Sequence, residues 1–453
     1  MRTAGDRMRV AAGFARTRWG SRFTSRAALR AWQSRRLQAF FDRQLPRAPY
    51  YRPFVQRRSP VRLCDLPIAD KDTLLTHFDA LNTRGIRFDH AMTLALAAER
   101  SRDFCPELGD VTVGLSSGTS GRRSVFLVSR RERLLWAGTI LARALSAESV
   151  ARLASPWRPP LSIALFLRAN SNLYATLHSR RVGFAFYDLL QPLDALIDAL
   201  SCRPPDVLVA PATVLRRLAE AHGSGALGIA PRQVISVAET LEPDDTVLIE
   251  AAFGRRVQQI YQATEGFLGY TCPAGGLHLN EACVHVEPEW LDAAHSRFHP
   301  IVTDFTRDTQ LIVRYRLDDV LRVAEEPCPC GDASLTLAAI DGRRDAVLLL
   351  PALAGGEPRA IFPDLVRRAL MLAGGGVRDY RVAQTAAGLD VRLVSDDPRA
   401  TALVRRELEA LFAQQGVVTP AIAFLPWREE PPGGKRIRIR RLAIGEAAVE
   451  VTA

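Results

Sequence analysis

The strongest constraint on the fold is a regular alternation of strand-like and helix-like segments between residues 130 and 260. Short apolar runs such as "LSIALFLR" (161–168) and "DVLVAP" (206–211) have the length and composition of buried strands. Amphipathic segments lie among them, such as "TVLRRLAEAHG" (213–223), which ends in glycine as helices often do. Strands that alternate with helices predict a layered α/β fold.

The pattern changes in the last third of the chain. After residue 275 it consists of short strands, and the final hundred or so residues show helix, strand, helix and strand again. A length of 453 residues favours at least two domains. We therefore expect an α/β protein with a large layered N-terminal domain, which includes a small β subdomain, and a small α+β C-terminal domain.

Composition excludes several classes of protein. The net charge is +11, but the arginines are scattered and often lie beside Asp or Glu, which favours a solvated basic surface over a nucleic-acid site. Such a surface attracts acidic partners such as nucleotides or an acidic carrier protein. No apolar run reaches 18 residues, so we expect no integral membrane segment and a cytoplasmic protein. Seven cysteines in a long chain make a disulfide framework improbable.

A loop rich in small residues is the first candidate site. It lies between two strand-like runs, where glycines and successive N–H groups can form a nest for a polyphosphate. A plain hairpin turn is the alternative for this segment taken alone. The loop consists of Ser116, Ser117, Gly118, Thr119, Ser120 and Gly121.

Four further segments carry candidate chemistry. In "YQATEG" a glutamate after a strand can hold Mg²⁺ through one carboxylate, and in "RYRLDD" a carboxylate can accept two ribose hydroxyls. "GRRD" follows at 342–345. "GGKRIRI" contains Lys435, and only Lys71 shares its residue type among the 60 basic residues. A compact ammonium can bridge the oxygens of two anions that repel each other.

Taken together and in this order, these segments resemble the adenylate-forming superfamily, in particular its phenylacetate–CoA ligase branch, over nearly the whole chain. "SVAETLEPDD", with Ala238 and Glu239, is similar to the segment that flanks the adenine. "FLRANSNLYATL" resembles enzymes associated with aryl polyene and xanthomonadin pigment genes, which are thought to activate a hydroxybenzoate for an acyl carrier protein. The resemblance implies a domain boundary near residue 342, with a mobile lid over 343–453.

The resemblance also implies roles for single residues. Thr119 and its loop would hold the β- and γ-phosphates of ATP, Thr264 a phosphate oxygen and Glu265 the Mg²⁺ ion. Asp319 would hold the ribose with help from Arg343, although Asp318 stands where the family has glycine, which leaves open which aspartate acts. Asp345 would be the hinge of the lid. Lys435 would bridge the acid and the α-phosphate. Tyr261 opens the motif that contains Thr264 and Glu265.

The acid and its acceptor are less constrained. Aromatic side chains beside amides would suit a flat phenolic acid, and an ordinary buried strand is the alternative for "FAFY". We expect ATP-dependent activation of an aromatic acid to an acyl adenylate, then transfer to a carrier-protein thiol. A CoA ligase, an enzyme that transfers AMP to a phenol and a non-catalytic nucleotide-binding scaffold are the alternatives. The candidate substrate residues are Asn170, Asn172, Tyr174 and Phe184.

A possible metal site completes the candidates. Cys272, His278, Cys328 and Cys330 offer three thiolates and one imidazole, a set that suits tetrahedral Zn²⁺ with a structural role. The spacing Cys-x-Cys is tighter than the usual Cys-x₂-Cys, and Cys283 competes as a ligand. Free buried cysteines are the alternative.

Overall fold

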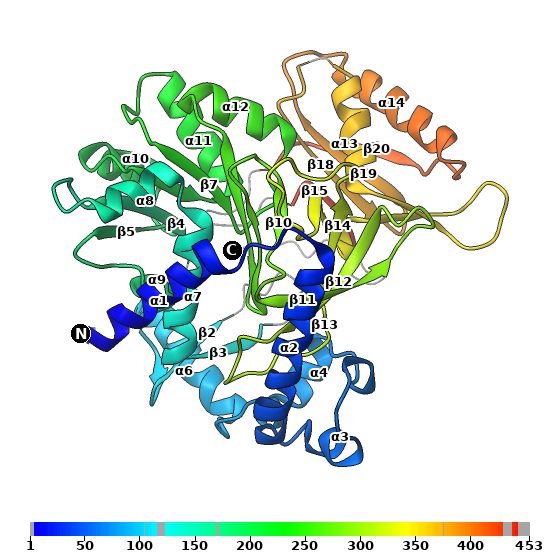
Figure 1. Cartoon of the computed structure of the whole chain (residues 1–453). Coiled ribbons are helices and arrows are strands. Elements are labelled where there is room, and N and C mark those ends of the chain that lie inside the picture. Colours follow the sequence, from blue (N-terminus) through cyan, green and yellow to red (C-terminus); the bar gives the residue numbers. More distant parts are fainter. Residues whose placement is uncertain are drawn as a thin grey trace. The chain divides into compact units, whose positions relative to one another are not determined.

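The computed structural model describes residues 4–103, 105–115, 123–168, 172–374, 376–428 and 437–442, without the side chains of 172 and 175. The chain divides into two compact units. The first contains residues 1–317 and 322–339, and the second contains 318–321 and 340–453. Figure 1 shows the helices and strands in sequence colours. The prediction that residues 343–453 act as a mobile lid stays a prediction.

A mixed sheet forms the centre of the first unit. Strands β5, β4, β6, β7 and β8 are parallel neighbours in this order, and β9 and β10 continue the sheet in antiparallel fashion. The strands are β4 (Leu161–Leu167), β5 (Val182–Asp188), β6 (Val207–Ala210), β7 (Gln233–Val237), β8 (Val257–Ala263), β9 (Gly266–Thr271) and β10 (Leu277–Leu279). The predicted alternation of strands and helices thus produces the parallel part of the sheet.

The short strands predicted after residue 275 extend the same sheet. Beyond β10 the order continues with β15, β14, β12 and β11, and β13 pairs with β12. The passage from the first unit to the second falls within β14 and β15. These strands are β11 (Val284–Trp290), β12 (Arg297–Asp304), β13 (Tyr315–Arg316), β14 (Asp319–Val323) and β15 (Thr336–Arg343).

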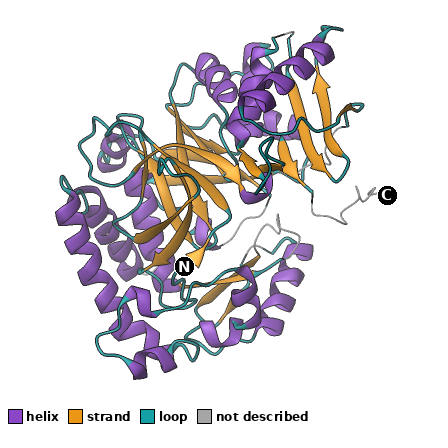
Figure 2. Ribbon diagram, turned by 90° about the vertical axis from the view of Figure 1, so that its right-hand side faces the viewer, coloured by secondary structure: helices purple, strands orange, loops and turns teal. Residues whose placement is uncertain are grey.

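Both faces of the parallel strands are buried. Along β4, Ala164 and Phe166 belong to one core cluster, whereas Ile163 and Leu165 belong to another. Successive side chains of a strand point to opposite faces, so helices must cover the sheet on both sides. Helices α10 (Leu193–Cys202), α11 (Ala212–Gly223) and α12 (Pro243–Phe253) pack in the first cluster, and α7 (Arg130–Ala144) and α8 (Ala147–Ala154) pack in the second. Figure 2 shows helices beside the sheet.

Two N-terminal helices complete the first unit. Helix α1 (Ala4–Gly20) packs along α7 at a close crossing, where a Cβ on Gly138 would lie 2.6 Å from the carbonyl oxygen of Val10. Helix α2 (Arg26–Gln44) begins at Ser25, whose side chain accepts a hydrogen bond from the backbone N–H of Ala28. Four further helices precede the three-stranded sheet of β1 to β3: α3 (Arg52–Arg57), α4 (Lys71–Thr76), α5 (Phe78–Leu81) and α6 (Phe88–Ser101). The short helix α9 (Asn172–Ala175) follows this sheet in the chain.

The predicted hairpin around the small-residue loop is present. Strand β2 (Val111–Leu115) pairs with β3 (Val125–Ser129) in antiparallel register, from Val111 opposite Ser129 to Leu115 opposite Val125. Strand β1 (Glu107–Leu108) adds a third strand. The loop itself, residues 116–121, lies outside the described residues.

The second unit has its own core. Four strands in the order β20, β19, β18 and β21 pack with α13 (Pro363–Leu372) and α14 (Ala400–Gln414) around a buried cluster that includes Val382, Val404 and Phe412. The four strands are β18 (Asp379–Thr385), β19 (Gly388–Val394), β20 (Ile422–Phe424) and β21 (Ile439–Arg441). Strands β16 (Leu348–Leu350) and β17 (Arg359–Ile361) form a separate two-stranded sheet. In the described part of the chain, none of the helices has both the length and the apolar character that a bilayer crossing requires.

Candidate functional site

The motif "YQATEG" forms the hairpin between β8 and β9. Ala263 pairs with Gly266, so Thr264 and Glu265 are the two residues of the turn. The Thr264 hydroxyl donates to Glu265 Oε2 over 2.9 Å, and both side chains are half-buried. Tyr261 is buried on β8, where the register shifts between Tyr261 and Gln262. The Glu265 carboxylate is of the type that holds Mg²⁺ together with phosphate oxygens.

A buried ion pair between Arg307 and Asp304 contacts the backbone of this turn. Arg307 donates from Nη2 to the carbonyl oxygen of Thr264 over 2.5 Å, and its Nε lies 3.4 Å from Asp304 Oδ2. Burial raises the pKa of Asp304, while Arg307 and the hydrogen bonds from Thr306 oppose that rise. The sequence analysis missed Arg307, because only the fold brings it to a turn 43 residues earlier in the chain.

The end of β7 carries the segment predicted to flank adenine. Ala238 follows the strand directly with φ of +64°, a left-handed conformation that is uncommon for a residue with a Cβ. Glu239 Oε2 accepts from the backbone N–H and the hydroxyl of Thr213 over 3.0 and 2.8 Å. This carboxylate therefore ties the turn after β7 to the N-terminal end of α11, where a negative charge is favourable.

The predicted ribose and hinge residues lie in the second unit. Arg343 Nη2 lies 3.2 Å from Asp318 Oδ2, and the backbone N–H of Arg344 donates to the carbonyl oxygen of Asp318 over 2.6 Å. Asp319 is half-buried at the start of β14. Asp345 is exposed in the 3₁₀ turn Arg344–Ala346. This ion pair joins Arg343 to the first aspartate of the pair, and the roles of all four residues stay predictions.

Some predicted residues lie outside the described part of the chain. Lys435 and Asn170 are among them, as are Ser116, Ser117, Gly118, Thr119, Ser120 and Gly121, and for Asn172 only the backbone is described. The residues that flank 429–436 make defined contacts. Arg381 lies over the ring of Trp427 at 4.6 Å and donates to the carbonyl oxygen of Arg428, and β21 pairs with β18.

Two of the predicted substrate residues share an aromatic cluster, which we define as Trp136, Tyr174 and Phe184. The rings of Trp136 and Tyr174 meet edge to face with centroids 5.8 Å apart. Phe184 packs in one hydrophobic core with Tyr174 and in another with Trp136. Trp136 Nε1 donates to Gln262 Oε1 over 3.1 Å, which links the cluster to the strand that ends in the Thr264–Glu265 turn. Burial raises the pKa of Tyr174 to about 12, so its hydroxyl stays protonated.

The sequence analysis missed Trp136 and Gln262. Trp136 lies on α7, which has no motif, whereas Gln262 lies inside "YQATEG" and could have been singled out as the position between Tyr261 and Thr264. The register shift between Tyr261 and Gln262 interrupts the simple alternation of side chains along β8. The contact between the Gln262 amide and Trp136 therefore depends on tertiary structure and does not follow from the strand period alone.

The four predicted metal ligands come together. Cys272 Sγ lies 3.5 Å from Cys328 Sγ, Cys330 Sγ lies 3.3 Å from His278 Nε2, and all four ligand atoms lie within 4.8 Å of one another. In a tetrahedral zinc site with Zn–S bonds of about 2.3 Å, two sulfurs are about 3.8 Å apart, so the arrangement fits the ion. Cys283, which was considered as a competing ligand, is not part of this group.

The surroundings of this Cys/His cluster also suit a metal. His278 Nδ1 lies 3.1 Å from the carbonyl oxygen of Ser334, an arrangement that places the proton on Nδ1 and leaves the Nε2 lone pair toward the cysteines. A Cβ on Gly276 would lie 2.6 Å from Cys328 Sγ, so glycine is needed for the close approach. Without an ion, burial and the neighbouring cysteines raise the pKa of Cys330 to about 12.

Comparison with known proteins identifies the fold. No protein-family model and no curated protein sequence matches the chain. Solved structures of a 2-hydroxyisobutyryl-CoA ligase in the postadenylation state, in complex with R3-HIB-AMP or 2-HIB-AMP, match with TM-scores of 0.64 and 0.65. Identity is 17% in each case, with 93% of this chain and 91% of the other covered. An open conformation of that ligase matches with a TM-score of 0.54 at 17% identity, over 91% of each chain.

These matches confirm the predicted fold. The chain shares the α/β fold of the 2-hydroxyisobutyryl-CoA ligase over 93% of its length. At 17% identity the likeness concerns the fold, so the chemistry has to be argued from the residues of this chain.

Proposed function

We propose that this protein is an ATP- and Mg²⁺-dependent adenylate-forming ligase that joins a carboxylic acid to a thiol. The observation that carries the proposal is the position of Thr264 and Glu265, which form a two-residue turn at the end of β8 in a fold shared with an acyl-CoA ligase. The acid attacks the α-phosphorus of ATP, which releases pyrophosphate and forms an acyl adenylate. A thiol then attacks the acyl carbon and AMP departs.

The residues of this chain divide the work. Glu265 would hold Mg²⁺, which neutralises phosphate charge when bound, and Thr264 would donate to a phosphate oxygen. Ser116 to Gly121 would cradle the β- and γ-phosphates, and Asp319, or its neighbour Asp318 with Arg343, would accept the ribose hydroxyls. Lys435 would lie between the acid and the α-phosphate and reduce their repulsion. Asp345 would be the hinge of a lid that brings Lys435 in and out.

The acid is proposed to be aromatic, such as a hydroxybenzoate, because the Trp136, Tyr174 and Phe184 rings and the Gln262 amide lie together next to the candidate turn. The thiol is proposed to be the phosphopantetheine of an acyl carrier protein, with free CoA as the alternative. A protein net charge of +11 favours an acidic carrier. We propose a cytoplasmic location for this reaction.

Adenylation is tested by pyrophosphate release from ATP with a panel of benzoates, hydroxybenzoates, cinnamates and fatty acids. Lys435→Ala should abolish release, whereas Lys71→Ala is a matched control, because Lys71 is the other lysine and begins α4. Lys435→Arg keeps the charge and tests whether a planar guanidinium can replace the ammonium. Folded protein that binds ATP but releases no pyrophosphate with any acid would favour the scaffold.

The acceptor is tested separately. After the acid is known, the enzyme is offered free CoA or a carrier protein with phosphopantetheine, and the thioester is measured by mass spectrometry. AMP retained on a phenolic product would identify the third alternative, a nucleotidyl transferase. These outcomes differ in product mass, so one spectrum distinguishes them.

We also propose that Cys272, His278, Cys328 and Cys330 hold a structural Zn²⁺ ion. All four positions would be filled by protein ligands, which suits a structural role and leaves no place for substrate. Metal analysis of the purified chain should give about one zinc per molecule, and the ion should be lost in Cys330→Ser. Metal-free protein of unchanged stability would instead favour four free thiols and an imidazole.

A further inference from the structure

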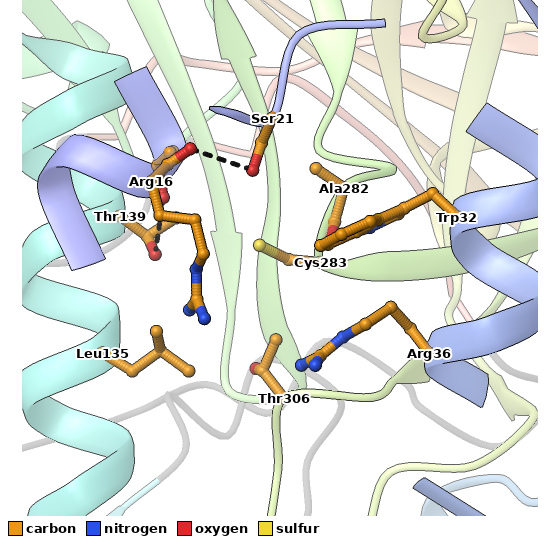
Figure 3. Close-up of a pocket in the computed structure, with 10 residues that line it drawn as sticks. Arg16, Ser21, Trp32, Arg36, Leu135, Thr139, Ala282, Cys283 and Thr306 are labelled. Atoms are coloured by element: carbon orange, nitrogen blue, oxygen red, sulfur yellow. Dashed lines mark hydrogen bonds between the residues drawn. The ribbon is translucent and has the colours of Figure 1, made fainter. Parts of the chain in front are cut away.

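A small cavity lies where the two N-terminal helices meet the core of the first unit, apart from the candidate turn and from the Cys/His cluster. It has a volume of ≈ 20 Å³ and is partly open to solvent (Figure 3). Helices α1, α2 and α7 form its walls, together with the segments after β10 and β12. The lining residues are Arg16, Thr17, Ser21, Trp32, Arg36, Leu135, Thr139, Ala282, Cys283 and Thr306.

Two arginines converge on this cavity. Figure 3 shows the guanidinium groups of Arg16 and Arg36 pointing from opposite sides into the same space. Within the described ranges, neither group forms an ion pair with a carboxylate, and the buried Nε of Arg36 has no hydrogen-bond partner. A buried donor without a partner costs about 1–3 kcal/mol, which a ligand with acceptor oxygens would recover.

Arg36 lies over the ring of Trp32 at 5.7 Å, but in the described part of the chain no carboxylate forms an ion pair with either arginine. Burial lowers the pKa of Arg36, and the nearby positive charges of Arg16 and Arg131 lower it further. Burial raises the pKa of the Cys283 thiol to about 11, so the thiol that faces the cavity is neutral. Asp304, whose charge acts on Cys283, already accepts from Thr306 and faces Arg307.

We propose that this cavity binds a small tetrahedral oxyanion, such as phosphate or a phosphoryl group, between Arg16 and Arg36. A guanidinium can donate hydrogen bonds to two oxygens of such an anion at once. Two guanidinium groups on opposite sides therefore suit an anion with more oxygens than the two of a carboxylate. The hydroxyl of Thr139, which also lines the cavity, adds a possible donor. This inference rests on the cavity alone and is independent of the proposed ligase function.

A bound anion would have a defined structural effect. It would join α1 and α2 to the segment that follows β12. That segment includes Thr306, which donates to Asp304, and Arg307, which holds the carbonyl oxygen of Thr264. The anion would thus stabilise the same loop that supports the candidate turn.

The test uses the full-length protein purified without phosphate, with ionic strength held constant by chloride. Titration calorimetry measures the binding of inorganic phosphate, and thermal unfolding measures its effect on Tm. We expect saturable binding of phosphate and a rise of Tm that grows with its concentration. Arg36→Gln and Arg16→Gln should each weaken binding by about tenfold or more. Arg35→Gln, an exposed arginine of the same helix, is the matched control and should bind normally.

The two variants also separate this site from a nucleotide site. Phosphate that binds elsewhere would bind equally to wild type, Arg16→Gln and Arg36→Gln, and that result would overturn the proposal. Acetate that competes as well as phosphate would also overturn it, because a planar carboxylate would then suffice. A simple phosphomonoester that binds more tightly than phosphate would support the proposal and identify the phosphoryl group of a larger molecule as the occupant. Arg16 is exposed, so its substitution should leave folding intact if Arg36→Gln is unstable.

Discussion

The two ends of strand β9 carry two different kinds of polar site. Its first residue, Gly266, follows the Thr264–Glu265 turn, and its last residue, Thr271, precedes Cys272 of the Cys/His cluster. The strand has six residues, so its first and last residues lie about 17 Å apart along it. At the turn the Thr264 and Glu265 side chains are half-buried, and Arg307 donates a hydrogen bond to the carbonyl oxygen of Thr264. At the cluster Cys272 and His278 are buried and the four ligand atoms face one another.

The difference in exposure suits the Thr264–Glu265 turn to catalysis and the Cys/His cluster to stabilisation of the fold. A carboxylate that is half-open to solvent can take a metal ion together with a substrate, whereas a closed set of four protein ligands has no free position. Substitutions at the start of β9 should therefore lower the rate of adenylation and leave the fold largely intact. Substitutions at its end should lower the free energy of unfolding and leave the rate of the remaining folded protein nearly unchanged.

Glu265→Gln should have the largest effect on catalysis. Loss of the carboxylate that we propose as the Mg²⁺ ligand should lower the rate of pyrophosphate release by about 100- to 1,000-fold, because charge on the phosphates is then poorly neutralised. The free energy of unfolding should change by less than about 1 kcal/mol, since glutamine keeps the size of the side chain. Glu326→Gln, an exposed position between β14 and β15, is the matched control. A normal rate in Glu265→Gln would remove this residue from the proposed mechanism.

Removal of the proposed Zn²⁺ ion should have the largest effect on stability. Cys330→Ser, or treatment of the wild type with a strong chelator, should lower the free energy of unfolding by about 3 kcal/mol, as expected when a structural metal is lost. Chemical denaturation with metal analysis checks this, and pyrophosphate release is expressed per folded molecule. Cys202→Ser is the control, because Cys202 is an exposed free cysteine at the end of α10. A lower rate per folded molecule without loss of stability would contradict the structural role that we propose for the Cys/His cluster.

Arg307→Gln should affect both properties, because Arg307 contacts the carbonyl oxygen of Thr264 and the buried carboxylate of Asp304. We expect a loss of about 1–3 kcal/mol in stability and a lower rate. Burial already raises the pKa of Asp304, and removal of the cation should raise it further. The folded state then binds its proton more tightly than the unfolded state, so the loss of stability should grow as the pH rises.

A second substitution separates the two effects of Arg307. Asp304→Asn removes the buried charge, so Arg307→Gln with Asp304→Asn should recover most of the lost stability. The rate should stay low in this double variant if Arg307 positions the Thr264–Glu265 turn. Recovery of stability and rate together would show that Arg307 acts only by neutralising Asp304.

The sequence predicted the Cys/His cluster and the turn for different reasons. Cysteine and histidine are rare enough in this chain that their residue types alone indicated the cluster, and the fold brings together ligands as far apart as residues 272 and 330. The Thr264–Glu265 turn followed from a short contiguous motif at the end of a strand. The parallel part of the sheet followed from the alternation of segments, because that pattern reflects burial on both faces.

The supporting residues could not be predicted in this way. Arg307, Arg16 and Arg36 are three of many arginines, and nothing local distinguishes an arginine that fills a buried role from one that is solvated. Their importance depends on contacts with residues far away in the chain, such as the carbonyl oxygen of Thr264 or the cavity beside Cys283. Residue type therefore indicates reactive groups well, whereas the groups that position them require tertiary structure.

Trp136→Phe should have the smallest effect on activity. It tests whether the aromatic cluster beside the Thr264–Glu265 turn binds the acid. Phenylalanine keeps a ring next to Tyr174 but removes the hydrogen bond from Trp136 Nε1 to Gln262 Oε1. One such bond contributes about 0.5–1.5 kcal/mol, so the KM for the acid should change by about threefold to tenfold while the KM for ATP stays constant. Trp157→Phe is the matched control, because Trp157 is 91% exposed. Equal changes in both KM values would place Trp136 in general support of the fold, because only a residue next to the acid can alter the binding of one substrate alone.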